Sequence, residues 1–159
     1  MDRPAVGGKG GSLGELTSAG IDVPPGFVVR TEAFEAFIQK LDKEEALRAP
    51  IEALDPHDLA AVGECTKAVR ARVENSPLPA DVRDAILSSY AELCADQPDT
   101  PVAVRSSATT EDAEDASFAG LQDTYLWVLG GDQVIQMVRS CWASLYSVES
   151  VCYRRKHGL

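Results

Sequence analysis

The chain has 159 residues and a mass of 17.0 kDa, which suffices for one domain with a hydrophobic core and excludes two substantial ones. Its formal net charge of −10 excludes a general attraction to nucleic acid, so an anionic ligand needs local cations to hold it. No apolar run approaches the roughly 18 residues of a membrane span and the start MDRPAVGGKG has no signal-peptide core, so we expect a soluble cytoplasmic protein.

The first predicted element is a glycine-rich loop that leads into a helix. Four glycines surround Lys9 in the segment Gly7–Ser12, and backbone amides in such a loop can approach a ligand closely. Leu13 and Leu16 follow at helical spacing, and Gly20 ends the helix. A glycine loop before a helix is typical of an anion site. The pattern matches neither Walker A nor G-x-G-x-x-G, so by itself it leaves open a solvated lysine on a turn.

A short strand and then several helices are predicted next. Prolines and a glycine precede Phe27–Val29, which we expect to form a buried strand. Thr31 is the predicted N-cap of a helix, Asp55–Pro56 begins a second helix, and a third begins near Pro79. Residues 42–100 thus read as a helical insert without catalytic groups. The expected core positions are Phe34, Phe37, Ile38 and Leu41, then Val62, Cys65, Val69 and Val73, then Val82, Ile86, Tyr90 and Leu93.

Residues 101–124 are the least apolar part of the chain. The run Val102–Val104 predicts a strand that ends at Arg105 beside three hydroxyl groups, and a guanidinium next to hydroxyl donors suits a phosphate-like anion. Phe118 and Gly120 argue against simple disorder, because a ring can anchor a loop and glycine adopts conformations that other residues avoid. We therefore predict a functional loop. The three hydroxyls belong to Ser106, Ser107 and Thr109.

The same loop carries a run of four acidic side chains. Magnesium prefers one or two carboxylates together with substrate phosphates, so a run of four acids more often faces water. We therefore assign no metal ligand to this run, which consists of Glu111, Asp112, Glu114 and Asp115.

The last predicted elements are a strand and a long helix. Thr124–Val128 alternates and predicts the strand, after which Gly130 and Gly131 turn the chain. Asp132 is the predicted helix cap, and the cations Arg154–Lys156 suit the dipole at the C-terminal end. The expected buried face contains Val134, Val138, Cys141, Trp142 and Leu145 and continues through Val148 and Cys152.

The cysteines and histidines show no catalytic or metal-binding pattern. The four cysteines have no C-x-x-C spacing and no partnering histidines, and three fall on apolar helical stripes, which predicts reduced core thiols. We expect both histidines to be solvated and without a catalytic role. These residues are Cys65, Cys94, Cys141, Cys152, His57 and His157.

Two runs resemble conserved blocks of one known family. The run GGKGGSLGELTSAGIDVPPGFVV, residues 7–29, is similar to the first block of the N-terminal PEP/pyruvate-binding domain of phosphoenolpyruvate synthases, pyruvate phosphate dikinases and rifampicin phosphotransferases. The run VAVRSSATTEDAEDASFAGLQDTYLWV, residues 102–128, is similar to its second block. The resemblance extends over the whole chain and is weakest between residues 40 and 100.

For the fold, we expect an α/β structure, and the resemblance implies the N-terminal lobe of an ATP-grasp-like nucleotide-binding domain. Residues 1–159 would form part of that domain. A small mixed sheet would contain strands near residues 27, 103 and 126, covered by five or six helices.

The resemblance also implies a set of nucleotide-binding residues. Lys9 is expected to contact the nucleotide phosphates, and Gly120–Thr124 is expected to cover the triphosphate. The ATP-binding residues so predicted are Lys9, Arg105, Ser106, Thr109, Gly120, Gln122, Asp123 and Thr124. No catalytic residue is assigned, and the magnesium ligands are expected outside this chain.

The implied function is that of an ATP-binding lobe of a phosphoenolpyruvate synthase-like dikinase. Such an enzyme converts ATP, pyruvate and water to AMP, phosphoenolpyruvate and phosphate through a phosphohistidine on a domain absent here. The implied partners are the other ATP-grasp lobe, the phosphohistidine domain and the acceptor domain. Two alternatives stay open: the same lobe in a rifampicin phosphotransferase or another biosynthetic enzyme, and a non-catalytic protein-binding module.

The start of the chain differs from the family pattern. Relatives carry about one strand before the glycine-lysine loop, whereas only Met1–Val6 precede it here. We therefore expect a fragment that is inactive by itself. An isolated lobe would also expose the apolar face that its partner lobe covers, which predicts self-association.

Overall fold

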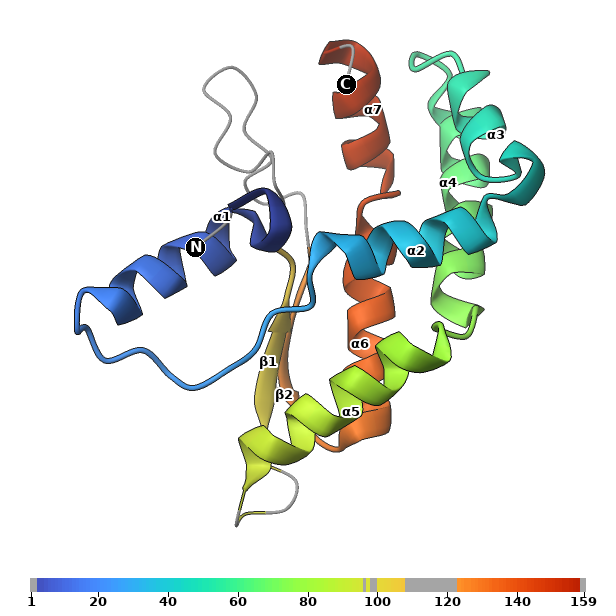
Figure 1. Cartoon of the computed structure of the whole chain (residues 1–159). Helices are drawn as coiled ribbons and strands as arrows, with labels where there is room; N and C mark the ends of the chain where they lie inside the picture. The colour runs from blue at the N-terminus through green and yellow to red at the C-terminus, as the bar shows by residue number, and fades with distance from the viewer. Residues whose placement is uncertain (1–2, 96, 98–99, 108–122, 158–159) are drawn as a thin grey trace.

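The computed structural model describes residues 3–95, 97, 100–107 and 123–157. This part contains seven α-helices, one short 3₁₀ helix and two strands (Figure 1). In chain order they are α1 (Arg3–Ser18), α2 (Thr31–Leu41), η1 (Lys43–Glu45), α3 (Arg48–Glu52), α4 (Leu59–Asn75), α5 (Ala80–Cys94), β1 (Val102–Arg105), β2 (Thr124–Val128), α6 (Gly131–Ser144) and α7 (Val148–His157).

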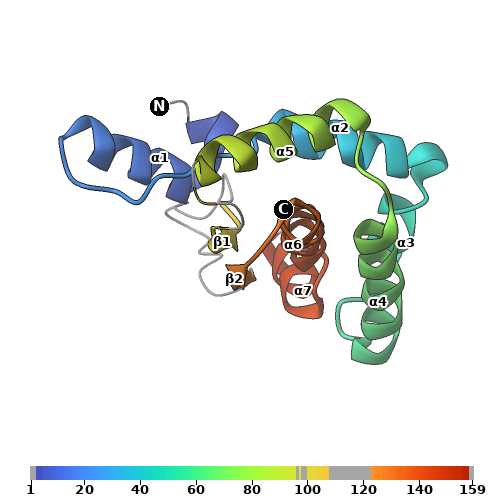
Figure 2. The same cartoon turned by 90° about the horizontal axis from the view of Figure 1, so that it is seen from below.

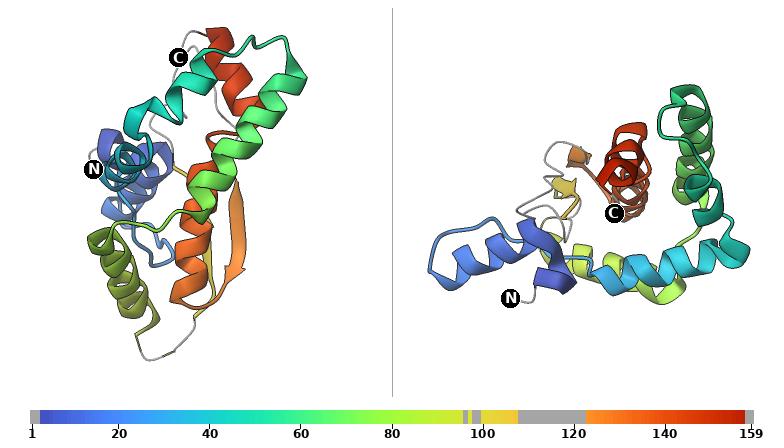
Figure 3. Two further views of the ribbon diagram at one scale, coloured as in Figure 1. Left: turned by 90° about the vertical axis from the view of Figure 1, so that its right-hand side faces the viewer. Right: turned by 90° about the horizontal axis from the view of Figure 1, so that it is seen from above.

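Helix α6 is the centre of the molecule. It contacts α4, α5 and both strands, and Figure 2 shows α6 and α7 between the sheet and α4. Its buried side chains include Val134, Val138 and Cys141, as the sequence pattern predicted. The same pattern predicted one long helix, but the chain breaks after Ser144 and α7 starts at Val148. Figure 3 shows α4 packed along this pair of helices.

The predicted core faces of the other helices are largely confirmed. Phe37, Val62 and Val73 are fully buried, and Ile86 is nearly so. Cys65 is only half-buried, because Thr66 occupies the buried side of α4 at that turn. Aromatic packing joins α2 to α6, with the ring centroids of Phe34 and Phe37 lying 5.5 and 5.2 Å from that of Trp142.

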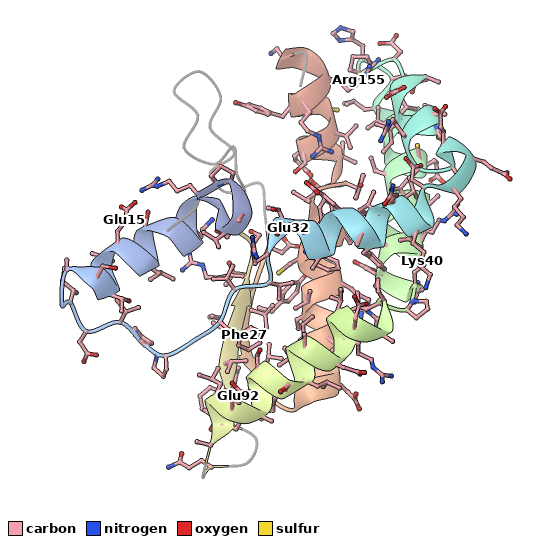
Figure 4. The ribbon with its side chains drawn as sticks, in the orientation of Figure 1. Glu15, Phe27, Glu32, Lys40, Glu92 and Arg155 are labelled. Atoms are coloured by element: carbon pink, nitrogen blue, oxygen red, sulfur yellow. The ribbon has the colours of Figure 1, made fainter. Side chains whose placement is uncertain are left out.

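The sheet differs from the prediction. It consists of β1 and β2 alone in the part of the chain that the structure describes, and the strands are antiparallel rather than mixed. The predicted strand Phe27–Val29 is wrong: residues 21–30 have no regular structure, and Phe27 is 38% exposed (Figure 4). Among the described residues no strand pairs with this segment, so its apolar residues have no ladder to join there. More helices form than the five or six expected.

Three predicted helix caps are displaced. Thr31 is the first residue of α2 rather than its cap, and its hydroxyl donates to the carbonyl of Pro4. Helix α4 is capped by Asp58, which accepts from the N–H of Ala61, instead of beginning at Asp55–Pro56. At α6 the N-cap is Gly130, with φ 83°, and Asp132 lies in the first turn. Each prediction found the helix and missed its start by one to three residues.

All four cysteines are free thiols, as predicted. Cys94 and Cys141 are buried, whereas Cys65 and Cys152 are half-buried. Among the described helices, none combines the length and apolar character that a membrane span needs.

Candidate functional site

The glycine-rich segment and the end of β1 are joined by the Ser107 hydroxyl. Gly10 donates its backbone N–H to Ser107 Oγ at 2.9 Å, and Ser107 Oγ donates to the carbonyl of Val6 at 2.7 Å. These bonds link residues about a hundred positions apart in sequence. The structure therefore brings the segment that carries Lys9 beside the one that carries Arg105.

Gly7 makes this approach possible. The glycines lie inside α1 rather than in a loop before it, and α1 is kinked at Gly7, where φ is 73° and ψ is 176°. This backbone conformation is essentially restricted to glycine. A Cβ at Gly7 would lie 2.0 Å from the carbonyl oxygen of Ser107. The close contact with Ser107 requires both the kink and the missing side chain.

Arg105 and Thr124 are neighbours across the sheet. They form the last pair of the β1–β2 ladder, and both side chains are exposed. Alternation places them on the face opposite Val104 and Tyr125, which pack against the core. Within the described residues, Arg105 makes no hydrogen bond or ion pair that would neutralise its charge.

Ser106 follows Arg105 directly in the chain, whereas Lys9 belongs to the distant segment that Ser107 contacts. Lys9 is half-buried in the turn of α1 that follows the kink, directly before Gly10. Ser106 is half-buried immediately after Arg105. The site segments thus combine an ammonium group, a guanidinium and hydroxyls, which are the donor types that bind phosphate oxygens.

Asp123 is held by the body of the protein. Its carboxylate accepts from the Tyr125 hydroxyl at 3.0 Å and lies 4.0 Å from the guanidinium of Arg70 in α4. Its backbone N–H donates to Ser144 Oγ at 3.4 Å, and its carbonyl accepts from the Cys141 thiol at 3.7 Å. Asp123 therefore ties the start of β2 to α4 and α6.

This anchor affects two titrating groups. Burial is the first cause that raises the pKa of Tyr125 to about 12, together with the Asp123 carboxylate, which accepts a hydrogen bond from the phenol and repels the phenolate. Burial, with a smaller contribution from Asp123, also raises the pKa of Cys141 to about 12. The Cys141 thiol is therefore protonated and inert at neutral pH.

Three predicted site residues lie outside the described part of the chain, namely Thr109, Gly120 and Gln122. The acidic run Glu111–Asp115 and Phe118 lie outside it as well.

The structure adds three residues that the predicted site did not contain. Ser107 was recognised only as one of three hydroxyls, and Gly7 and Arg70 were given no role in holding the segments. The signal for Gly7 was present, because a dense cluster of glycines often marks close approach of another backbone. Nothing in the sequence pattern of α4 distinguishes Arg70 from other solvated arginines.

Sequence comparisons identify related proteins. The family described as "Pyruvate phosphate dikinase, AMP/ATP-binding domain" matches residues 3–159. The chain is 43% identical over 161 residues to a phosphoenolpyruvate synthase of Deinococcus radiodurans, covering 99% of this chain and 20% of the relative. It is 40% identical over 191 residues to a phosphoenolpyruvate synthase of Pyrococcus furiosus, covering 99% and 23%.

A third relative is a probable phosphoenolpyruvate synthase of Methanocaldococcus jannaschii. It is 41% identical over 159 residues, which is 99% of this chain and 13% of the relative. The chain thus spans less than a quarter of the length of each of these three curated relatives.

Proposed function

The chain belongs to the pyruvate phosphate dikinase AMP/ATP-binding domain family, as the resemblance of its two conserved blocks predicted, and from this membership we propose that it binds the phosphates of ATP. In this proposal Lys9 and Arg105 grip the polyphosphate from two segments of the chain. Ser106, Thr109 and Thr124 supply hydroxyl donors, and Gly120, Gln122 and Asp123 belong to the covering segment.

The observation that carries this proposal is the hydrogen bond between Gly10 and Ser107. It fixes the backbone next to Lys9 against the side chain of Ser107, two residues after Arg105, so two cations that are far apart in sequence come from adjoining segments. Phosphoryl transfer depends mainly on positioning and on neutralising phosphate charge. In a chain of net charge −10, an exposed guanidinium without an acidic partner in the described residues suits this role.

Asp123 fits the proposal better as an anchor than as a direct ligand. A carboxylate repels phosphate, and this one lies near Arg70 and accepts from Tyr125. We propose that Asp123 fixes the C-terminal end of the connection between β1 and β2, as Ser107 fixes its N-terminal end. Bound ATP supplies the phosphoryl group, and these residues orient it.

The complete reaction is a further part of the proposal. The relatives named phosphoenolpyruvate synthase suggest an ATP-grasp-like lobe of a cytoplasmic phosphotransferase that forms phosphoenolpyruvate from ATP, pyruvate and water. Magnesium ligands, the second lobe, the phosphohistidine and the acceptor domain would lie outside this chain. On this proposal the chain alone binds nucleotide weakly and does not turn over.

Two other functions compete with this one. A rifampicin phosphotransferase or another biosynthetic enzyme could reuse the same nucleotide lobe with a different phosphate acceptor. A non-catalytic protein-binding module would have no need for Lys9 and Arg105 in adjoining polar segments, and their presence favours nucleotide binding.

Isothermal titration calorimetry of the chain with ATP and magnesium tests the proposal. We expect weak binding that either Lys9→Ala or Arg105→Ala abolishes. Lys40→Ala and Arg83→Ala are matched controls, because both residues are exposed cations on other helices. Binding that survives both site substitutions, or that the control substitutions weaken equally, would place the nucleotide elsewhere.

A further inference from the structure

A cavity lies away from the glycine segment, between α2, α3, the end of α6 and α7. Its volume is about 640 Å³, within the range of ligand pockets. Most of its wall is apolar and comes from helices near the start and near the end of the chain. The apolar residues are Phe34, Ile38, Leu47, Ile51, Leu145 and Val151.

Three arginines also line this cavity, which is unusual in a chain with an excess of acids. Arg154 and Arg155 come from the last turns of α7, and Arg48 comes from the start of α3. Figure 4 shows Arg155 at the end of α7 near α3, where its guanidinium donates to the carbonyl of Leu54 at 3.2 Å. Cations from two separate elements therefore face one space.

Arg154 is the most buried of the three, and the described residues contain no acidic partner for it. Its guanidinium donates to the carbonyl of Leu145 at 2.6 Å and lies 5.9 Å from the centre of the Tyr146 ring. Burial lowers its pKa, and in the described residues no carboxylate lies within salt-bridge distance. A partly buried cation is costly unless an anion compensates it, and the adjoining cavity leaves room for one.

The acids of the cavity do not fill that role. Asp42 accepts the N–H groups of Leu47 and Arg48 at 2.6 and 3.0 Å, and its other oxygen lies 3.8 Å from Arg48 Nε. Its carboxylate is thus committed to the start of α3. Glu52, the second acid, is exposed at the rim.

We propose that this cavity binds a small organic anion, with a carboxylate or phosphate group held by the arginines and an aromatic or branched aliphatic body against the apolar wall. A guanidinium has five donors, and the Leu145 carbonyl uses one of those on Arg154. The site is separate from the segments of Lys9 and Arg105, so the proposal does not depend on nucleotide binding.

The test is a nuclear magnetic resonance titration of the full 159-residue chain with 3-phenylpropionate, which has one carboxylate on an aromatic body. We expect saturable shifts at the amides of Leu47, Arg48 and Val151, with a dissociation constant on the order of 1 mM. The neutral analogue 3-phenylpropanol should bind about tenfold more weakly, because it offers the arginines no charge. No saturable shift at these amides, or equal binding of the two compounds, would overturn the proposal.

Substitutions test whether the arginines hold the carboxylate of the ligand. The double variant Arg48→Gln/Arg155→Gln removes two exposed cations and keeps the hydrogen bond of Arg154 to the Leu145 carbonyl at the end of α6, so we expect the fold to be retained. This variant should bind 3-phenylpropionate with an affinity lower by about tenfold or more. The matched control is Arg72→Gln, since Arg72 is exposed and donates to the carbonyl of Leu41 but does not line the cavity. A double variant that binds like the wild type would contradict the assignment.

Discussion

Gly7 and Ser107 lie in such close contact that a single methyl group at Gly7 would meet the Ser107 carbonyl oxygen at 2.0 Å. The contact joins a kink in α1 to the residue two positions beyond the end of β1. Two separate features therefore disfavour a side chain at Gly7: its positive φ and its contact with Ser107. Gly20 shares only the first feature, so a comparison of the two positions separates their effects.

We predict that Gly7→Ala destabilises the chain by about 3 kcal/mol, from backbone strain together with a clash against main-chain atoms. Gly20→Ala is the control, because Gly20 also has positive φ, 76°, but a Cβ there meets nothing within 4 Å. Gly20→Ala should cost only about 1 kcal/mol. Urea unfolding followed by tryptophan fluorescence measures the free energy of unfolding of both variants. An equal loss of stability in the two would show that the contact with Ser107 is unimportant.

The Ser107 hydroxyl leads to a second prediction. Ser107→Ala leaves the N–H of Gly10 and the carbonyl of Val6 without this partner, which should cost about 1 to 2 kcal/mol of unfolding free energy. If Ser107 holds Lys9 near Arg105, the substitution should also weaken ATP binding in calorimetry. Ser106→Ala is the control for stability, with an expected change within about 0.5 kcal/mol. Unchanged ATP affinity in a destabilised Ser107→Ala variant would mean that the hydrogen bonds support α1 alone.

The elements were predictable where local signals were strong. Val62, Val69 and Val73 recur at helical spacing, and α4 buries all three. The alternation of Thr124–Val128 correctly indicated β2. Phe27–Val29 has the same apolar character, yet it forms no strand, because a strand requires a partner whose position the local sequence does not encode.

The candidate site follows the same division. Residue type and spacing pointed to the segments of Lys9 and Arg105, but the hydrogen bond that joins them links Gly10 to a residue 97 positions away. Arg70 approaches Asp123 only because α4 packs against α6, so its role depends on tertiary structure. Tertiary contacts of this kind have no local periodicity from which to infer them.

The anchor at Asp123 predicts a dependence of stability on alkaline pH. The pKa of Tyr125 is raised from 10.0 to about 12, so the folded state holds the phenolic proton more tightly than the unfolded state does. This contribution to stability is complete below pH 10 and is lost as the pH rises towards 12. Unfolding midpoints in urea should therefore fall more steeply over this interval for the wild type than for Tyr125→Phe.

A companion substitution separates the two causes of this shift. Burial is the largest single cause, so Asp123→Asn should lower the pKa of Tyr125 without restoring its ordinary value. The difference in tyrosinate absorbance between each protein and its Tyr125→Phe counterpart isolates this one group. A complete return to the ordinary value in Asp123→Asn would show that the carboxylate, and not burial, controls the phenol.

Strand β2 leads to the last prediction, which concerns self-association. Leu126 and Trp127 are 75% and 76% exposed, and Thr124–Val128 contains no charged residue that would oppose edge-to-edge pairing. We expect the chain to self-associate through this surface in sedimentation velocity as its concentration rises, because association removes two large apolar side chains from water. Leu126→Thr/Trp127→Asn should remain monomeric, and asparagine suits the positive φ of 57° at position 127.

The control is Leu59→Thr, since Leu59 is 65% exposed at the start of α4, away from the sheet. Association that Leu59→Thr abolishes as effectively would assign the contact to the helices, and a wild type that stays monomeric at every concentration would show that the exposed strand does not drive association.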